Sequence, residues 1–150
     1  MKIKLNIAVL GFIIIATACK KSNFTTKPTI KIKSISPTTV NTGDIIRLEA
    51  SYTDKEGDIG DSVIIVYKLY EGTSIFNIDS SKYLIKDFGI PPGSREGDLK
   101  IEFLYNQIIS GYVPIPGVDK DRDASFGIIL KDLAGNKSDY VETQKILIKK

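Results

Sequence analysis

The stretch "GDIIRLEASYTDKEGDIGDSVIIVY", residues 43–67, contains the two segments that decide the fold class. In its first half, apolar and polar residues alternate over residues 46–52, which is the period-two pattern of a strand with one buried face. In its second half, residues 63–67 are all apolar, which is typical of a strand covered on both faces. Between the halves, Asp and Gly residues favour a turn. The stretch therefore predicts two successive strands joined by a polar loop.

The same pattern recurs along the rest of the chain. Alternating runs occur at residues 30–32, 99–105 and 126–131, and further strands are expected near residues 81–88 and 140–148. Pro, Gly and Asn residues between the runs favour turns. No apolar stripe with a helical period follows the N-terminal segment. These features predict an all-β fold: a single antiparallel β-sandwich of about seven strands over residues 29–150.

Two segments resemble bacterial immunoglobulin-like or cadherin-like domains. Residues 43–67 are similar to the second and third strands of such domains. The segment "GIILKDLAGNKSDYVE", residues 127–142, resembles their last hairpin, in which an Asp-x-x-Gly-Asn turn precedes the final strand. The resemblance implies an immunoglobulin-like sandwich. The core disulfide of antibody domains is absent from it, because the chain has a single cysteine.

The N-terminus has the organisation of an export signal. Lys2 and Lys4 precede an uncharged run over residues 5–18, which is shorter than the roughly 20 apolar residues of a membrane-spanning helix. The run ends in Ala16-Thr17-Ala18, directly before Cys19. This order resembles the lipobox of bacterial lipoproteins, and small lipoproteins of the Bacteroidota often join such a motif to an immunoglobulin-like domain.

The lipobox resemblance implies three segments in the chain. These are a signal peptide over residues 1–18, a lipidated Cys19 with a tether over residues 19–28, and the sandwich over residues 29–150. It also implies an exported protein whose partner is the membrane, held through the lipid on Cys19. An outer-membrane location is expected, facing either the periplasm or the surface. The alternative is an ordinary signal peptide cut after Ala18, which leaves a free thiol.

Two acidic loops are candidates for Ca²⁺ binding. Alternate acidic side chains on a curved loop can point at one centre, and Ca²⁺ requires six to eight oxygen ligands. The first loop and the last hairpin are expected at the same end of a sandwich. Together they supply Asp54, Glu56, Asp58, Asp61, Asp132, Asn136 and Asp139. The second loop, residues 119–123, interleaves its acids with Lys120 and Arg122. The alternative for both is that Asp, Asn and Gly only form turns.

Composition argues against catalysis and against nucleic-acid binding. The chain has no histidine, which removes the commonest general base, and its one cysteine belongs to the anchor. No glycine-rich phosphate loop or Gly-x-Ser-x-Gly elbow occurs. The 21 basic and 18 acidic residues are nearly balanced, whereas nucleic-acid binding requires a clustered basic face. The chain is therefore expected to be no enzyme and to need no cofactor other than Ca²⁺.

A binding or scaffolding role at the cell envelope is the expectation that remains. Tyr112, Val113 and Ile115 lie in a loop stiffened by two prolines and are candidates for contact with a protein or glycan partner. The alternative for this loop is that its apolar side chains pack under the edge of the sandwich. For the protein as a whole, the alternatives are a structural spacer of the envelope or a small carbohydrate-binding or hydrolytic module.

Overall fold

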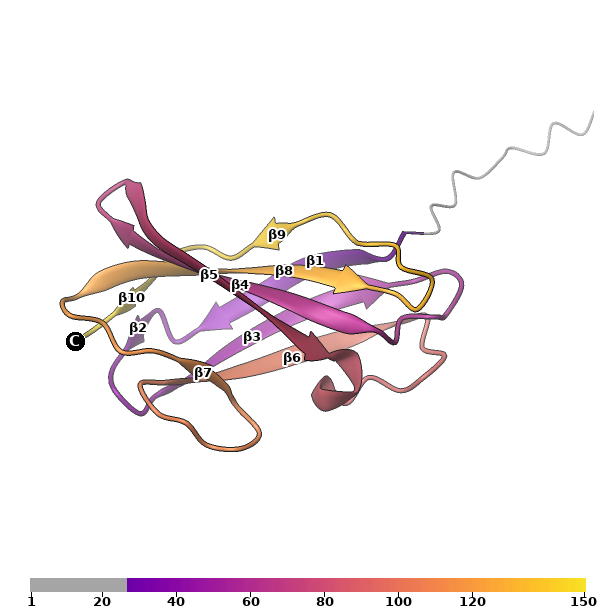
Figure 1. The fold of residues 1–150 in the computed structure, drawn as a ribbon, viewed down its shortest axis with the longest axis horizontal. Helices are drawn as coiled ribbons and strands as arrows, with labels where there is room; N and C mark the ends of the chain where they lie inside the picture. The colour runs from indigo at the N-terminus through magenta and orange to yellow at the C-terminus, as the bar shows by residue number, and fades with distance from the viewer. Residues whose placement is uncertain (1–26) are drawn as a thin grey trace, which may run out of the picture.

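Two β-sheets pack face to face in the computed structural model, which describes residues 27–150 (Figure 1). The predicted signal peptide (1–18), Cys19 and the tether as far as residue 26 lie outside the described residues. One 3₁₀ turn, η1 (Ile85–Phe88), is the only helical element within residues 27–150. No helix in this part of the chain is long and apolar enough to cross a membrane.

The strands are divided four and six between the sheets. The first sheet has the order β1–β3–β6–β7, with β1 (Thr29–Ser36), β3 (Ile45–Thr53), β6 (Glu96–Tyr105) and β7 (Val113–Ile115). The second has the order β2–β10–β8–β4–β5, with β2 (Thr39–Val40), β10 (Ile146–Ile148), β8 (Arg122–Lys131), β4 (Ser62–Glu71) and β5 (Ser74–Leu84). β9 (Val141–Glu142) also pairs with β8. The immunoglobulin-like sandwich predicted from the sequence is confirmed.

The two halves of the stretch 43–67 form β3 and β4, as their patterns predict. β3 alternates between the core and the surface, and β4 lies between β8 and β5 in the second sheet. The loop between them, residues 54–61, connects one sheet to the other. The core therefore lies between two long antiparallel pairs of strands: β3 with β6 in the first sheet and β4 with β8 in the second.

The described part of the chain departs from the predicted strand plan in three places. It has ten strands instead of about seven, because it includes the short segments β2, β7, β9 and β10, and two of the pairings are parallel. The strand expected at 81–88 ends at Leu84 and continues as η1, which stops at Gly89 with a positive φ of 71°. The strand expected at 140–148 is split, because the N–H of Phe126 donates to Thr143 Oγ1 and interrupts the ladder.

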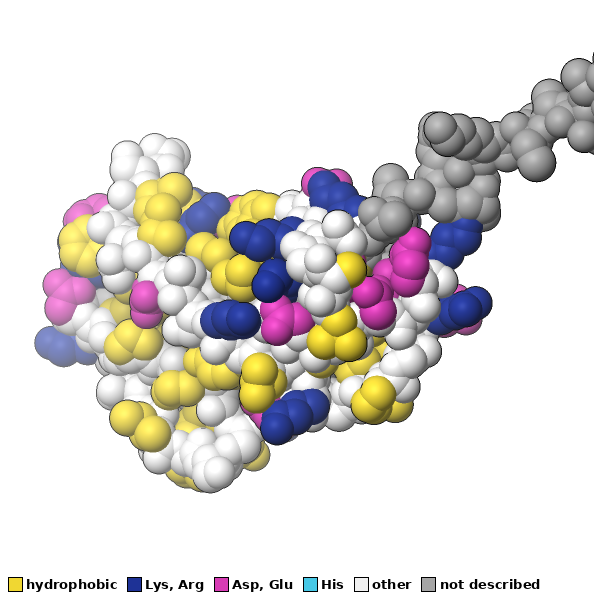
Figure 2. Space-filling model, turned by 45° about the vertical axis from the view of Figure 1, so that its right-hand side comes forward, with side chains coloured by type: hydrophobic (Ala, Val, Ile, Leu, Met, Phe, Trp, Pro, Cys, Tyr) yellow, Lys and Arg dark blue, Asp and Glu magenta, His cyan; other side chains and the backbone are white. Residues whose placement is uncertain are grey.

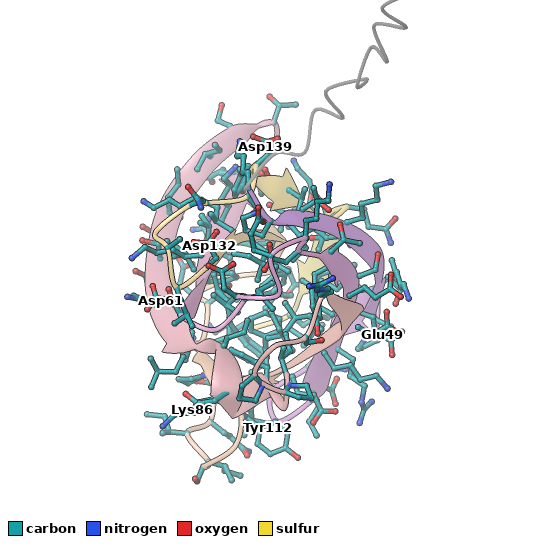
Figure 3. The ribbon with its side chains drawn as sticks, turned by 90° about the vertical axis from the view of Figure 1, so that its right-hand side faces the viewer. Glu49, Asp61, Lys86, Tyr112, Asp132 and Asp139 are labelled. Carbon is teal, nitrogen blue, oxygen red and sulfur yellow. The ribbon has the colours of Figure 1, made fainter. Side chains whose placement is uncertain are left out.

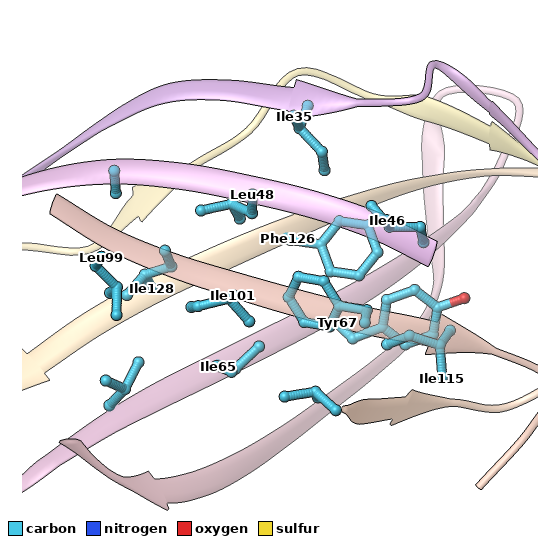
Figure 4. Packing of buried hydrophobic residues seen from close by; sticks show 14 of the residues in the cluster. Ile35, Ile46, Leu48, Ile65, Tyr67, Leu99, Ile101, Ile115, Phe126 and Ile128 are labelled. Carbon is cyan, nitrogen blue, oxygen red and sulfur yellow. The ribbon is translucent and has the colours of Figure 1, made fainter. Parts of the chain in front are cut away.

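Aromatic rings from both sheets meet in the core (Figure 4). The Phe126 side chain is completely buried, with its ring centroid 4.5 Å from that of Phe103 in the opposite sheet and 5.4 Å from that of Tyr67 beside it. Isoleucine and leucine side chains from β3, β4, β6, β8 and β10 surround these rings. The buried apolar residues of the described chain run from Ile30 in β1 to Ile148 in β10, so strands from both ends of this part of the chain contribute to the core.

The acidic loop lies at the end of the sandwich where the described chain begins. β1 starts at this end, and the loops 54–61 and 132–140 also lie there. The C-terminus lies at the opposite end (Figure 1). An ion pair of 2.5 Å between Lys27 Nζ and Asp139 Oδ1 ties the first described residues to the second of these loops. The predicted placement of both loops at one end is therefore correct.

Candidate functional site

Three acidic side chains of the loop 54–61 converge on one point. Asp54 follows the last residue of β3, and its N–H donates to the carbonyl of Arg95 at 2.6 Å. Its Oδ2 accepts the N–H of Asp58 at 2.8 Å, which curls the loop back over Asp54. Gly57 allows this turn with a positive φ of 74°. As a result, one oxygen each of Asp54, Glu56 and Asp58 lie within 4.8 Å of one another.

The loop 132–140 lies against this group and supplies a fourth carboxylate. Asp132 is fully buried at the end of β8 and accepts hydrogen bonds from the N–H and Nδ2 of Asn136 at 2.7 and 2.9 Å. The N–H of Leu133 donates to the carbonyl of Asp58 at 3.0 Å and joins the two loops. Figure 3 looks onto this end, and Figure 2 shows acidic side chains gathered on it.

Without a bound cation, the close carboxylates of this group repel one another and are poorly hydrated. The Asp54 side chain is 2 % exposed, and its Oδ1 makes no hydrogen bond within residues 27–150. Asp58 Oδ1 is likewise buried without a partner in this part of the chain. Loss of hydration raises the pKa of Asp58, and two further effects raise it more: a hydrogen bond to the Asp54 carboxylate that forms only when Asp58 is protonated, and the negative charges of Asp132 and Asp54. Each unpartnered buried oxygen lowers stability unless a cation or a proton compensates it.

The donor set fits a hard divalent cation. All of its ligand atoms are carboxylate oxygens, which Ca²⁺ prefers over nitrogen or sulfur donors. Two oxygens that share one Ca²⁺ at 2.3–2.6 Å can be at most about 5 Å apart, and the three converging oxygens satisfy this limit. Glu56 is exposed, so the site is open to water on its outer side. Asp54, Asp58 and Glu56 would hold the ion, and Asp132 would add negative charge behind them.

The structure does not bring the other predicted ligands into this group. Asp61 Oδ2 lies 3.1 Å from Lys131 Nζ and 3.5 Å from Lys82 Nζ, and the hydrogen bond with Lys131 lowers the pKa of Asp61. The Asp139 side chain is 89 % exposed and pairs with Lys27. Asn136 is engaged with Asp132. The seven predicted residues therefore fall into three sets: Asp54, Glu56 and Asp58 converge, Asp132 and Asn136 bond to each other in a turn beside them, and Asp61 and Asp139 are neutralised by lysines.

The second acidic loop is neutralised in the same way. Asp119 lies 3.0 Å from the guanidinium of the buried Arg122, which lowers the pKa of Asp119. Asp121 accepts the N–H of Lys150 at 3.0 Å and lies 3.5 Å from Lys149 Nζ. Because basic groups already pair with these carboxylates, the loop 119–123 does not form a comparable site. Its location beside the C-terminus places it at the other end of the domain.

The most perturbed carboxyl outside the loops is part of a hydrogen-bonded network. Glu142 accepts bonds from Lys68 Nζ at 2.7 Å, from the Tyr70 hydroxyl at 2.9 Å and from Ser125 Oγ. Burial alone would raise the pKa of Glu142, but these hydrogen bonds outweigh it and lower the value to about 2. A general acid needs the opposite shift. Glu142 therefore serves to join β4, β8 and β9.

Tyr112, Val113 and Ile115 separate into two environments. Val113 and Ile115 belong to β7 and are 7 % and 3 % exposed, so their side chains pack in the core. Tyr112 is half-buried and, next to Val113, lines a groove of about 740 Å³. The other aromatic walls of the groove are Tyr83 from β5 and Phe88 from η1. These two residues were missed by the sequence reasoning, because more than twenty residues separate them from Tyr112.

Comparison with known proteins gives similarity of fold alone. No family model matches the chain, and no curated protein does. A late embryogenesis abundant protein of known structure is 17 % identical over 87 % of this chain and 76 % of its own, with a TM-score of 0.49. The sporulation control protein Spo0M from Bacillus subtilis is 9 % identical over 83 % of this chain, with a TM-score of 0.43, and this chain spans half of its length.

A lipoprotein is also among the similar solved structures. The conjugative transposon lipoprotein from Bacteroides eggerthii DSM 20697 is 13 % identical over 79 % of this chain and 95 % of its own, with a TM-score of 0.36. At these identities the similarity concerns the arrangement of strands and assigns no ligand to this chain.

Proposed function

We propose that this chain is an exported lipoprotein, anchored through Cys19, whose immunoglobulin-like domain binds one Ca²⁺ ion at the end nearest the anchor. Its role at the cell envelope is binding or scaffolding without catalysis. The observation that carries the proposal is the buried Asp54, whose Oδ1 has no partner in the described chain and whose carboxylate has an oxygen within 4.8 Å of oxygens of Asp58 and Glu56. Turn formation alone does not require a buried carboxylate with an unpaired oxygen.

The position of the site relative to the anchor supports an envelope role. A flexible linker of nine residues spans about 15–18 Å on average, so the tether would keep the domain close to the lipid surface. The loops 54–61 and 132–140 lie at the end where residue 27 enters the domain, which is the end that would face the membrane (Figure 1). A bound cation would neutralise acidic groups there that otherwise oppose anionic lipid headgroups. The Ca²⁺ site and the anchor therefore belong to one functional end of the protein.

Direct titration tests the cation site. Calcium added to the domain from Ser22 to Lys150 in a calorimeter is expected to bind at one ion per chain. Asp54→Asn is expected to abolish the binding, because it removes the charge of the most buried ligand. Asp121→Asn, at the opposite end, serves as the matched control and should leave the titration unchanged. The absence of binding heat in millimolar calcium, or an equal titration curve for Asp54→Asn, would exclude the site.

Fractionation of cells tests the anchor. The full-length chain is expected in the membrane fraction, and Cys19→Ala is expected to move it to the soluble exported fraction, because acyl chains on the thiol provide stable membrane binding. Ser22→Ala, three residues later, is the control and should remain with the membrane. A Cys19→Ala protein that stays in the membrane fraction would contradict lipidation at this residue.

A further inference from the structure

One side of β6 has no strand beside it over most of its length. β3 pairs with β6 on one side from Glu96 to Leu104. On the other side, β7 pairs only with the last three residues of β6, 103–105. Before β7 the chain turns away at Gly111, which has a positive φ of 93°. Within residues 27–150, the outer edge of β6 is therefore open over residues 96–102.

The hydrogen-bonding groups along this edge have a defined direction. The N–H of Tyr105 donates to the carbonyl of Asp44 on the β3 side at 3.2 Å, and the N–H of Asn106 donates to Ile115 on the β7 side at 2.7 Å. Because backbone groups alternate between the two sides of a strand, every second residue before Tyr105 bonds toward β3, and the residues between them point to the other side. The N–H and C=O groups of Asp98, Lys100 and Glu102 consequently point toward the open edge, ready to pair with an added strand.

The open edge borders the groove of about 740 Å³. Tyr83 and Phe88 form one wall, with their ring centroids 6.1 Å apart in an edge-to-face arrangement, and Tyr112 closes the end nearest β7. Both Tyr83 and Phe88 pack against the core with part of their surface still exposed. Figure 3 shows Tyr112 and η1, marked by Lys86, at the same side of the sandwich. An apolar side chain placed there would extend the core.

The outward face of β6 carries an exposed positive charge, Lys100, that makes no close ion pair with its neighbours. Arg47 and Glu102 form a close pair, with 2.9 Å between Nε and Oε1. Lys100 Nζ is 4.0 Å from Glu49 Oε1, and the Lys100 side chain is 72 % exposed. A strand added beside β6 would place a side chain directly opposite Lys100 on this face. An acidic residue at that position gives charge complementarity.

We propose that the open edge of β6 binds an extended peptide segment of a partner protein by strand addition. The segment presents apolar side chains to Tyr83 and Phe88 on one face and an acidic side chain to Lys100 on the other. Main-chain hydrogen bonds provide affinity in such complexes, and alternate side chains provide specificity. The outer edge of β5 is also unpaired, but its side chains are exposed on both faces over residues 74–82 and form no comparable wall.

This inference deepens the proposed binding role and is independent of the Ca²⁺ site. The domain from Lys20 to Lys150, which contains every described strand and the whole described core, is labelled for amide-exchange NMR. The probe is a capped nine-residue peptide that alternates threonine with valine and has glutamate in place of the central threonine. At about nine-tenths occupancy, exchange at the Lys100 and Glu102 amides is expected to slow about tenfold, since only the free domain exchanges. The Ile101 amide already bonds to β3 and should not change.

Two variants with reversed charge make the test specific. Lys100→Glu is expected to abolish the protection, because it places like charges opposite each other. The Lys100 side chain is exposed, so the variant should keep the fold, and an unchanged spectrum of the core amides verifies this. Lys82→Glu on the β5 edge is the matched control and should bind the peptide normally. The peptide experiment is run both in calcium and in chelator, so failure of the groove and failure of the cation site give separate results.

Three outcomes would overturn the proposal. The first is no change at Lys100 and Glu102 at millimolar peptide. The second is protection of the β5 amides, which would place strand addition at the other sheet edge. The third is a response at Tyr112 and Phe88 to maltohexaose in the absence of any response to the peptide, which would make the groove a glycan site.

Discussion

Replacing Phe126 by alanine is expected to destabilise the domain by about 3–5 kcal/mol, the usual cost of removing a buried phenylalanine ring. The ring is completely buried in β8 and contacts aromatic rings from both sheets, at 4.5 Å from Phe103 and 5.4 Å from Tyr67. Its removal leaves a cavity that rigid strands on both sides cannot fill. Urea denaturation should show a much lower midpoint with an unchanged slope.

The matched control for this change is Phe76→Ala in β5. Phe76 is 56 % exposed, and the Arg122 guanidinium lies over its ring, 3.8 Å from the centroid. Loss of that contact should cost about 1 kcal/mol or less. A cost for Phe126→Ala as small as that for Phe76→Ala would contradict the packing of the two sheets around Phe126.

The sequence predicts those strands that are stabilised by burial of at least one face. β3, β4, β6 and β8 each have a buried face or two, and burial imposes the period-two or continuous apolar pattern by which they are found. β5 has no such pattern, because its residues are exposed on both faces and the strand is held in place by its backbone pairing with β4. For this reason only its C-terminal part was predicted, with an end four residues too late.

The sequence predicts the part of the candidate cation site that comes from residues close together in one loop and from the order of strands in the sandwich. Asp54, Glu56 and Asp58 are close in sequence, and the order of strands in a sandwich places the Asp132 loop beside them. The position of Asp61 depends on sheet register instead. Ser62 lies opposite Lys131 in β8 and Leu84 in β5, so lysines from two distant strands reach the neighbouring Asp61. Such a pairing leaves no signal in the local sequence.

The groove beside β6 was not predicted for a similar reason. Tyr112 was singled out because of the prolines that follow it, whereas Tyr83 and Phe88 come from the segment 81–88, where only a strand was expected. Their meeting depends on where β5 ends and η1 turns back toward β6. The open edge itself arises from the shortness of β7, which residue patterns do not reveal.

Calcium is expected to raise the melting temperature of the domain by several degrees. A ligand that binds only the folded state adds about 2.7 kcal/mol at 100 times its dissociation constant, and this corresponds to several degrees for a domain of this size. The stabilisation should fade as the pH falls, because Asp58 has a raised pKa in the fold and protons compete with the ion for its carboxylate.

Without calcium the pH dependence of this group has the opposite sign. Because the pKa of Asp58 is raised above its unfolded value, the protonated carboxyl is the form that the fold tolerates. Its contribution to stability is fully present below the unfolded pKa, near 4, and is lost as the pH rises through the raised value. Asp58→Asn imitates the protonated form. In chelator at neutral pH, it should therefore melt at a higher temperature than the wild type.

The measurement that separates a cation site from turn formation most directly is the thermal melt of wild type and Asp58→Asn at neutral pH, each in millimolar calcium and in chelator. The wild type is expected to melt several degrees higher in calcium, and Asp58→Asn to melt above the wild type in chelator but to gain nothing from calcium. Equal melting temperatures of the wild type in calcium and in chelator would contradict the site and return these carboxylates to turn formation.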